Sequence, residues 1–192
     1  MAEVARPERH ASLLRQEETG LIIVDVQEAF RPVIDGFESV ARNCSILAAG
    51  FGILGRPVIV SEQYPKGLGR TASEIVEALP EGTPTIEKMR FSACGVEPFD
   101  AELERSGCRS FVVAGVETHV CVNQTVLDLL ARGYGVHVAS DAVSSRTAAN
   151  REAGLRKMSA HGAEVSSAET VLFEMLEVAG GDAFKAISKL VR

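Results

Sequence analysis

The sequence predicts an α/β fold, in which helices cover both faces of a mostly parallel sheet. Four short runs are apolar throughout except at His137, namely residues 20–24, 58–60, 111–114 and 136–139. A run that is apolar on both faces, rather than alternating, is typical of a parallel strand covered from both sides. Segments with helical spacing of apolar residues lie between these runs. Strand and helix therefore alternate, which favours a three-layer domain.

In the first half of the chain, two expected strands flank one expected helix. The strand at 20–24 ends at Asp25, and the strand at 58–60 ends at Ser61. Between them, residues 40, 44 and 47 have the i, i+4, i+7 spacing of a helix face, followed by several glycines. All seven prolines lie at or before Pro98. We therefore expect residues 61–98 to hold most of the irregular structure.

The second half predicts tighter strand–helix repeats. The strand at 111–114 ends at Gly115, and the strand at 136–139 is followed by Asp141. Apolar residues at 122, 126, 129 and 130 predict a helix between them, and Gly133 lies where a left-handed helix cap is expected. Shorter apolar stripes at 155–158 and 171–176 predict the last helices.

Composition bounds the function. The chain has 192 residues, of which 46% are hydrophobic and 24% charged, so a disordered chain is excluded. This length suits a polar lead-in, residues 1–18, followed by one domain, residues 19–192. The longest uncharged run, residues 43–55, is shorter than the roughly 18 residues of a membrane span. A net charge of −6 without clustered Lys and Arg argues against nucleic-acid binding.

The four cysteines are expected to be free thiols. They form no C-x-x-C pair, and the first 18 residues lack the pattern of a secretory or mitochondrial leader. A disulfide framework is not expected in such a chain, so we predict a cytoplasmic protein. The cysteines are Cys44, Cys94, Cys108 and Cys121.

Cys121 is the thiol that position singles out. Ligands of open parallel sheets bind at the carboxyl ends of the strands, and residues 115–122 lead from such an end into a helix. Thr118 is the expected N-cap, which places Cys121 in the first helical turn. There the helix dipole lowers a thiol pKa, and free N–H groups can hold an oxyanion. The alternative is a small buried hydrophobic residue, the commonest role of a free cysteine.

Asp25 and Lys88 are the next candidates, each with an ordinary alternative. Asp25 ends the most apolar strand, where an unpaired buried carboxylate is costly. It either caps the next turn or acts as a general base. Lys88 lies in the polar stretch 87–92. By residue type alone, a solvated surface lysine is the favoured interpretation.

These segments together resemble the isochorismatase-like cysteine hydrolase superfamily, and most closely its isochorismatase domain-containing branch. The resemblance runs from about Thr19 to Leu176 and depends on several motifs in order. They are Leu-Ile-Ile-Val-Asp25-Val-Gln27-Glu-Ala-Phe30, Glu62-Gln63-Tyr64-Pro65-Lys66-Gly67-Leu68-Gly69, Lys88-x-x-Phe91-Ser92, Gly115-Val-Glu-Thr-His-Val-Cys121-Val, Leu127 to Tyr134, and Asp141 to Arg146.

The resemblance implies a fold and a catalytic set. The fold is a three-layer, Rossmann-like arrangement with a six-stranded, mostly parallel sheet. The set is a catalytic triad of Asp25, Lys88 and Cys121. The resemblance also implies a cis peptide bond between Val116 and Glu117, which aims the N–H groups of Glu117 and Cys121 at the substrate oxygen. Such enzymes attack an amide-like carbonyl with the thiolate and pass through a thioester.

Two departures from related branches narrow the function. The nicotinamidase branch binds a metal through an Asp-x-His pair after its second strand and a later histidine. This chain has no histidine between His10 and His119, so we expect no catalytic metal and no cofactor. True isochorismatases cleave a vinyl ether without a nucleophilic cysteine, so Cys121 favours C–N hydrolysis.

The remaining residues near the expected site have open roles. Phe30, Tyr64 and Phe91 either wall the substrate pocket or pack beside it. His119 either lines the pocket or, as we favour, orients the turn. Asp141 is expected to be structural and to cap a turn together with Ser144 and Ser145.

The sequence therefore predicts a metal-independent cysteine hydrolase that cleaves an amide or carbamoyl C–N bond of a small-molecule substrate. The alternative is a non-catalytic regulatory or interaction protein that retains the scaffold. We expect no nucleic-acid or membrane partner. We expect a homo-oligomer, either a dimer or a tetramer, because residues 46–54 and the C-terminus from Phe173 are rich in apolar residues.

Overall fold

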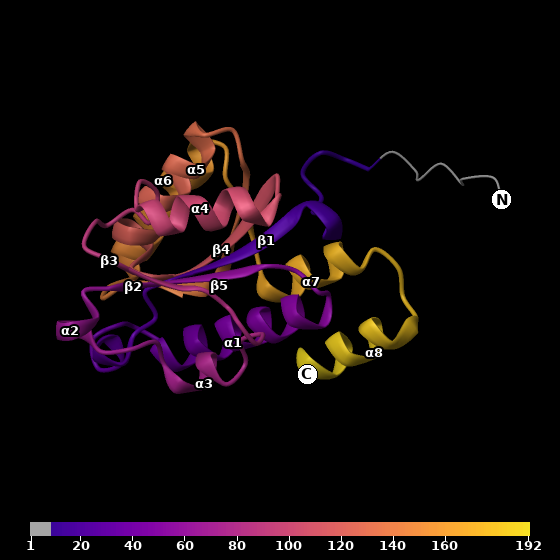
Figure 1. Ribbon diagram of the computed structural model, residues 1–192, viewed down its shortest axis with the longest axis horizontal. Coiled ribbons are helices and arrows are strands. Elements are labelled where there is room, and N and C mark those ends of the chain that lie inside the picture. The colour runs from indigo at the N-terminus through magenta and orange to yellow at the C-terminus, as the bar shows by residue number, and fades with distance from the viewer. Residues whose placement is uncertain (1–8) are drawn as a thin grey trace.

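Residues 9–192, which the computed structural model describes, form one six-stranded sheet with helices on both faces (Figure 1). Each strand is parallel to its neighbours, and the order is β3-β2-β1-β4-β5-β6. The predicted fold class is confirmed. The strands are β1 (Thr19–Val24), β2 (Val58–Gln63), β3 (Thr85–Lys88), β4 (Ser110–Val116), β5 (Gly135–Ser144) and β6 (Glu164–Ser166).

The continuous apolar run of β1 is explained by burial of both sheet faces. Leu21 and Ile23 belong to one core cluster, and Ile22 and Val24 belong to the other. Because side chains alternate between faces along a strand, a central parallel strand needs apolar residues at every position. The six residues of β1 are all buried.

The helices divide between the two faces. In Figure 1, α1, α3, α7 and α8 lie on one side of the sheet, while α4, α5 and α6 lie on the other. The helices are α1 (Phe37–Ile53), α2 (Pro65–Leu68), α3 (Ser73–Val76), α4 (Glu97–Ser106), α5 (Asn123–Ala131), α6 (Ala148–Ala160), α7 (Ala168–Leu176) and α8 (Gly181–Leu190). As expected, Gly133 follows α5 with a φ of 86°.

Several boundaries differ from the sequence expectation. β2 continues to Gln63 and β5 continues to Ser144, so Ser61 and Asp141 lie within strands and not at their ends. The edge strands β3 and β6 have largely exposed residues, so neither has the fully apolar pattern that marks the four inner strands. The segment 61–98, expected to be irregular, contains α2, α3, β3 and the start of α4.

Part of the polar lead-in packs on the domain. Residues 1–8 lie outside the described part of the chain. Of the remainder, Leu14 is buried in the core, whereas Leu13 is partly exposed. The Arg9 guanidinium donates to the Leu14 and Glu174 carbonyl oxygens, which ties this segment to α7. The lead-in is therefore continuous with the domain from Arg9 onward.

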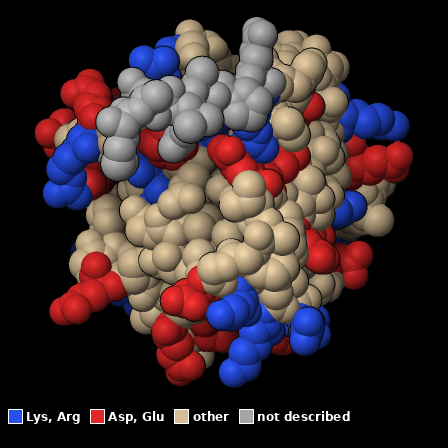
Figure 2. Space-filling model, turned by 90° about the vertical axis from the view of Figure 1, so that its right-hand side faces the viewer, with Lys and Arg blue, Asp and Glu red and all other residues tan. Residues whose placement is uncertain are grey.

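The surface at the right-hand end of Figure 1 has mixed charge. Figure 2 shows that basic and acidic side chains are interspersed around this face, with uncharged residues at its centre. Among residues 9–192, no helix is long and apolar enough to cross a membrane. The apolar stretch 46–54 is largely used inside the domain, because Leu47 and Phe51 are fully buried. This stretch therefore gives little support to the expected oligomer.

Candidate active site

Asp25, Lys88 and Cys121 lie together at the carboxyl edge of the sheet. Asp25 follows β1, Lys88 is the last residue of β3, and Cys121 lies in a turn shortly after β4. The Lys88 Nζ atom is 2.7 Å from Asp25 Oδ2. The Cys121 thiol lies close enough to the Asp25 carboxylate and the Lys88 ammonium for both charges to act on its pKa. Three residues that are distant in sequence thus form one cluster.

The Asp25 carboxylate is held in a fixed orientation. Asp25 has a φ of 54°, in the left-handed region that few residues other than Gly, Asn and Asp adopt. This conformation ends β1 and turns the side chain toward its neighbours. Ser61 Oγ donates a 2.7 Å hydrogen bond to Asp25 Oδ1, while Lys88 occupies Oδ2. Asp25 is 0% exposed, so these donors replace the water that an ionised carboxylate would otherwise bind.

Burial sets the protonation states of the cluster. Desolvation raises the pKa of Asp25, although Lys88 opposes the shift. Desolvation and the Asp25 charge raise the pKa of Cys121 to about 12. The expected lowering of the Cys121 pKa is therefore wrong. The resting thiol is therefore protonated at neutral pH, and a base must remove the proton before the sulfur can attack.

The turn that carries Cys121 is not the helix start that the sequence suggested. Residues Thr118–Val122 form a π-helical turn, and α5 begins only at Asn123. Thr118 is therefore not an N-cap. Its Oγ1 atom is buried and has no hydrogen-bond partner among the described residues. The peptide bond between Val116 and Glu117, directly before this turn, is cis, which is the geometry that the resemblance implies.

Two contacts join the nucleophile turn to the loop after β5. Glu117 Oε2 accepts from the Arg146 backbone N–H at 2.9 Å and from its Nε at 3.1 Å. His119 Nδ1 lies 3.1 Å from Ser145 Oγ. His119 thus has the turn-orienting contact that we favoured, at a half-buried position. From the sequence, Ser145 was expected to help Asp141 cap a turn, and Arg146 was placed only within the motif 141–146.

Close backbone approaches also restrict this region. A Cβ added to Gly115, which has a φ of 121°, would lie 2.1 Å from the Val24 carbonyl oxygen. A Cβ added to Gly154 on α6 would lie 2.9 Å from the Thr118 carbonyl oxygen. Such distances exclude a side chain without a backbone shift, so both positions require glycine. The end of β4 is therefore packed tightly against β1, and the turn is packed against α6.

The aromatic candidates are placed differently from one another. Phe30 is partly buried and packs against the core, which is the packing alternative considered from the sequence. Tyr64 and Phe91 are 48% and 53% exposed. Tyr64 lines a groove of about 340 Å³ that also includes Lys66 and Met89.

Asp141 is structural, but not in the predicted way. Its Oδ1 atom accepts a 2.8 Å hydrogen bond from the Ala168 N–H at the start of α7. Ser144 Oγ donates instead to the Asp35 carbonyl oxygen, and Ser145 contacts His119. Asp141 thus helps to cap α7. Because it lies inside β5, which continues to Ser144, it does not close a turn with the two serines.

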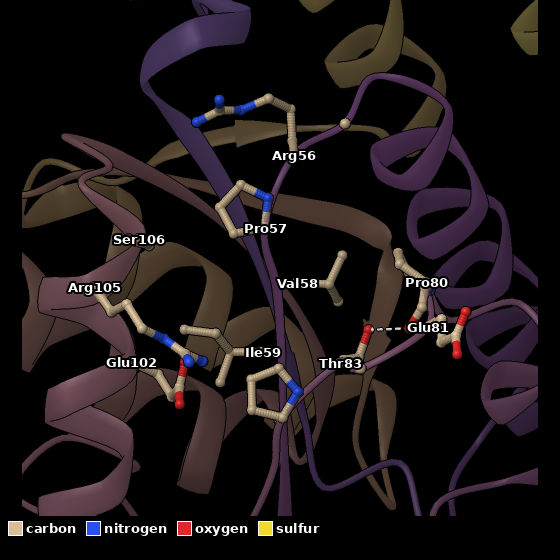
Figure 3. A pocket seen from close by; sticks show the side chains of 13 residues that line it. Arg56, Pro57, Val58, Ile59, Pro80, Glu81, Thr83, Glu102, Arg105 and Ser106 are labelled. Atoms are coloured by element: carbon tan, nitrogen blue, oxygen red, sulfur yellow. Dashed lines mark hydrogen bonds and ion pairs between the residues drawn. The ribbon is translucent and has the colours of Figure 1, made fainter.

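Two further observations concern a second cavity and the possibility of a metal site. A cavity of about 400 Å³ lies at the amino ends of β2 and β3, where residues 55–59, 80–84 and three α4 residues line it (Figure 3). It is at the edge of the sheet opposite to Asp25. Within the part of the chain that the structure describes, no three His, Cys, Asp or Glu side chains are grouped so that they could hold a metal ion.

Comparison with known proteins identifies the family. A family model named "Isochorismatase domain" matches residues 19–170. The chain belongs to the isochorismatase family. It is 42% identical to isochorismatase domain-containing protein 1 of Salmo salar over 168 residues, which are 88% of this chain and 59% of that protein. It is 38% identical to the secreted isochorismatase effector Isc1 of Phytophthora sojae, covering 100% of this chain and 93% of the effector.

Solved structures of family members superpose closely. The structure described as the MAR1 ribonuclease of Caenorhabditis elegans has a TM-score of 0.89 and 36% identity, and the match covers 93% of this chain and 92% of that one. YcaC from Pseudomonas aeruginosa, with hexane-2,5-diol and covalent acrylamide, has a TM-score of 0.87 and 25% identity, with 95% and 93% covered. The names attached to family members therefore describe different activities.

Proposed function

We propose that this protein is a metal-independent cysteine hydrolase that cleaves the C–N bond of a small amide or carbamoyl compound through a thioester. The observation that carries the proposal is the buried ion pair of Asp25 with Lys88, which lies close enough to Cys121 for both charges to act on its thiol. A carboxylate close to a thiol and an ammonium, in a buried site, can remove the thiol proton while the ammonium stabilises the resulting thiolate.

The first half of the reaction follows from the protonation states. Asp25 takes the thiol proton, and the Cys121 sulfur attacks the substrate carbonyl carbon. Lys88 offsets the negative charge as it moves from the carboxylate to the sulfur. Protonated Asp25 then returns the proton to the leaving nitrogen, and the C–N bond breaks to leave a thioester. Because burial raises the pKa of Asp25, its carboxyl group holds a proton at a higher pH than an ordinary aspartic acid does, and so can carry that proton to the leaving nitrogen.

The second half needs water and an oxyanion site. Asp25, again ionised, takes a proton from water as the water attacks the thioester, and the thiol is regenerated. We assign the oxyanion to the N–H groups of Glu117, directly before the π-helical turn, and of Cys121 within it. The Val120 and Val122 N–H groups both donate to the Glu117 carbonyl oxygen, which fixes the turn around the nucleophile.

The acrylamide adduct named for YcaC supports a reactive nucleophile in the family. Acrylamide is a small amide that also reacts with thiolates by conjugate addition. Its use as a probe of Cys121 follows directly. The names isochorismatase and ribonuclease, by contrast, describe cleavage of a vinyl ether and of a phosphodiester. Neither reaction gives a buried Asp–Lys–Cys cluster an obvious acyl intermediate.

The deciding experiment measures ammonia release from a panel of primary amides, ureas and carbamoyl compounds, with a chelator present throughout. The purified chain should release ammonia from at least one of them, and Cys121→Ala should abolish release while remaining folded. RNA and isochorismate serve as two further substrates. Turnover of RNA or isochorismate that survives Cys121→Ala would overturn the proposal. So would turnover of no compound together with a co-purifying protein partner, which favours a regulatory protein.

A cytoplasmic location and a homo-oligomeric state belong to the same proposal. The four cysteines are free and buried, which suits a reducing compartment. Phe173 and Val178, near the end of α7, are exposed apolar residues at which copies of the chain could meet. Sedimentation analysis of the purified chain reports the state directly.

A further inference from the structure

We propose that Gln63 is a positioning residue for the Lys88 ammonium, and that Gln27 fixes the backbone of Gln63 for this purpose. Neither glutamine side chain is hydrogen-bonded to the Cys121 sulfur. Both act through Lys88, whose side chain is 0% exposed and therefore depends entirely on protein oxygens for solvation. Because this role presupposes the proposed function, the thiol of Cys121 is the group whose behaviour it should change.

Lys88 Nζ is surrounded by two side-chain oxygens and two backbone carbonyl oxygens. Asp25 Oδ2 lies at 2.7 Å and Gln63 Oε1 at 2.8 Å. The carbonyl oxygens of Phe91 and Arg90 lie at 3.0 and 3.1 Å. An ammonium has three N–H donors, so these acceptors satisfy it without water. Only Gln63 among them is a side-chain acceptor whose charge does not change during the reaction.

That constancy matters when Asp25 takes the thiol proton. The carboxylate becomes neutral, and its attraction for the ammonium falls at the moment when the sulfur becomes anionic. Gln63 Oε1 then keeps the Lys88 ammonium in place, so that it can stabilise the Cys121 thiolate. Lys88 is one of the groups that lower the pKa of Cys121 against the effect of burial, so its position bears directly on the thiol.

The orientation of the Gln63 amide is fixed by its second contact. Gln63 Nε2 donates to the Met89 carbonyl oxygen at 3.0 Å. A flipped amide would place an NH₂ group against the Lys88 ammonium and an oxygen against the Met89 carbonyl, so both contacts would be lost. Gln63 also pairs in register with Lys88 between β2 and β3, which places the two residues side by side.

Gln27 holds the Gln63 backbone from both sides. Gln27 Oε1 accepts from the Gln63 N–H at 2.8 Å, and Gln27 Nε2 donates to the Gln63 carbonyl oxygen at 3.0 Å. The same Nε2 donates to the Gly69 carbonyl oxygen at 2.7 Å. Gln27 is 0% exposed and lies two residues after Asp25. The connection therefore runs from Asp25 through Gln27 and Gln63 to Lys88 and back to Asp25.

The test uses carboxamidomethylation of Cys121 by iodoacetamide across pH, which needs no known substrate. Gln63→Met keeps the length of the side chain but removes both amide contacts. Since a hydrogen bond to a charged group contributes enough to change an equilibrium roughly tenfold to a hundredfold, the plateau labelling rate should fall by about that factor. Gln27→Met should lower the plateau in the same direction and by less.

Gln63→Glu separates positioning from simple structural support. A second carboxylate beside Lys88 competes with Asp25 for the ammonium, so the acid limb of the labelling profile should move upward by about one pH unit. Gln124→Met and Gln124→Glu, at an exposed position on α5, are the matched controls and should leave the profile unchanged. Melting curves identify a variant that fails to fold, in which case Gln63→Glu, which preserves shape, carries the test.

The outcomes distinguish the two proposals. A loss of labelling in Asp25→Asn, with wild-type profiles in both Gln63 variants, would overturn the role of Gln63 and leave the proposed function standing. Shifted profiles in the Gln63 variants with no effect of Asp25→Asn would overturn Asp25 as the base and retain Gln63 as the residue that places Lys88. A wild-type profile in Gln27→Met alone would remove Gln27 from the inference.

Discussion

The two ends of β1 each bring a thiol and a cation together, and only one of them adds a carboxylate. At the start of β1, the Arg56 guanidinium donates to the Thr19 carbonyl oxygen and lies 3.5 Å from Cys108 Sγ. At the end of β1, Cys121 has both Lys88 and Asp25 beside it. A cation can stabilise a thiolate after it has formed, whereas only a base can remove the proton. The comparison therefore separates a thiol that is merely next to a charge from one that can be activated.

The positions of the cavities do not follow this chemical difference between the two edges of the sheet. The cavity at the amino edge of the sheet is lined in part by Arg56 and has a volume of about 400 Å³ (Figure 3). Cys121, at the other edge, is only 7% exposed. Space alone does not choose between the two edges, because a groove of about 340 Å³ at the carboxyl edge is lined in part by Lys88. The chemical groups, and not the size of the hollow, identify the candidate active site.

The largest expected difference between the two thiols is in alkylation. At neutral pH, iodoacetamide should label Cys121 faster than Cys108, and also faster than Cys44 and Cys94. Asp25→Asn should slow the labelling of Cys121 by about a hundredfold or more, the lower bound for loss of a general base. Mass spectrometry of peptides from the folded protein gives each rate.

Thiol acidity alone predicts another order. Burial raises the pKa of Cys94 to about 11, below the value of about 12 for Cys121. If Cys94 is labelled as fast as Cys121, or if Asp25→Asn changes nothing, the base at the end of β1 is inactive. The comparison between the two ends then fails.

The second difference is in stability. Lys88→Met leaves Asp25 buried without its cation and should lower the free energy of unfolding by about 3–5 kcal/mol. Arg56→Met removes two partly buried hydrogen bonds at the other end and should cost about 1 kcal/mol. Urea denaturation measures both. The double variant Asp25→Asn with Lys88→Met buries no ionised group, so it should regain part of the loss. Equal losses in the two single variants would mean that the Asp25–Lys88 pair does not behave as a buried pair.

The smallest effect, and the sharpest, is on pH dependence. Burial raises the pKa of Asp25 above its ordinary value of 3.8, and labelling needs the carboxylate. The Cys121 rate should therefore fall, as pH decreases, through a midpoint above 3.8. Because the pKa of Cys121 is about 12, no thiol limb is expected near neutrality. A profile that instead rises through neutral pH and persists in Asp25→Asn would show that the thiol ionises without Asp25.

The inner part of the fold could be predicted from the sequence because its strands are buried on both faces. The runs that became β1, β2, β4 and β5 are apolar at every position except His137, a pattern that few other structures require. β3 and β6 are edge strands with exposed side chains, and their local sequence contains no such constraint. The number of strands came from the family resemblance.

The candidate site divides in the same way. Asp25 and Cys121 were found because they follow apolar strands, whereas Lys88 was an ordinary surface lysine until the resemblance was considered. The π-helical turn could not be read from Thr118 to Val122, because it depends on contacts with Arg146, Ser145 and Gly154. Gln63 was missed since its pairing with Lys88 exists only once β3 is placed beside β2.

β3 has one further consequence, which concerns motion. It has four residues and pairs through its ladder with β2 alone, at the edge of the sheet, yet it holds the ammonium of the candidate active site. Edge elements of this size open locally at a lower free energy than the core of a domain. Detachment of β3 would carry Lys88 away while β1, β4 and the nucleophile stay folded. Local opening of β3 should therefore inactivate the site first, so heat or denaturant should abolish activity before the domain unfolds.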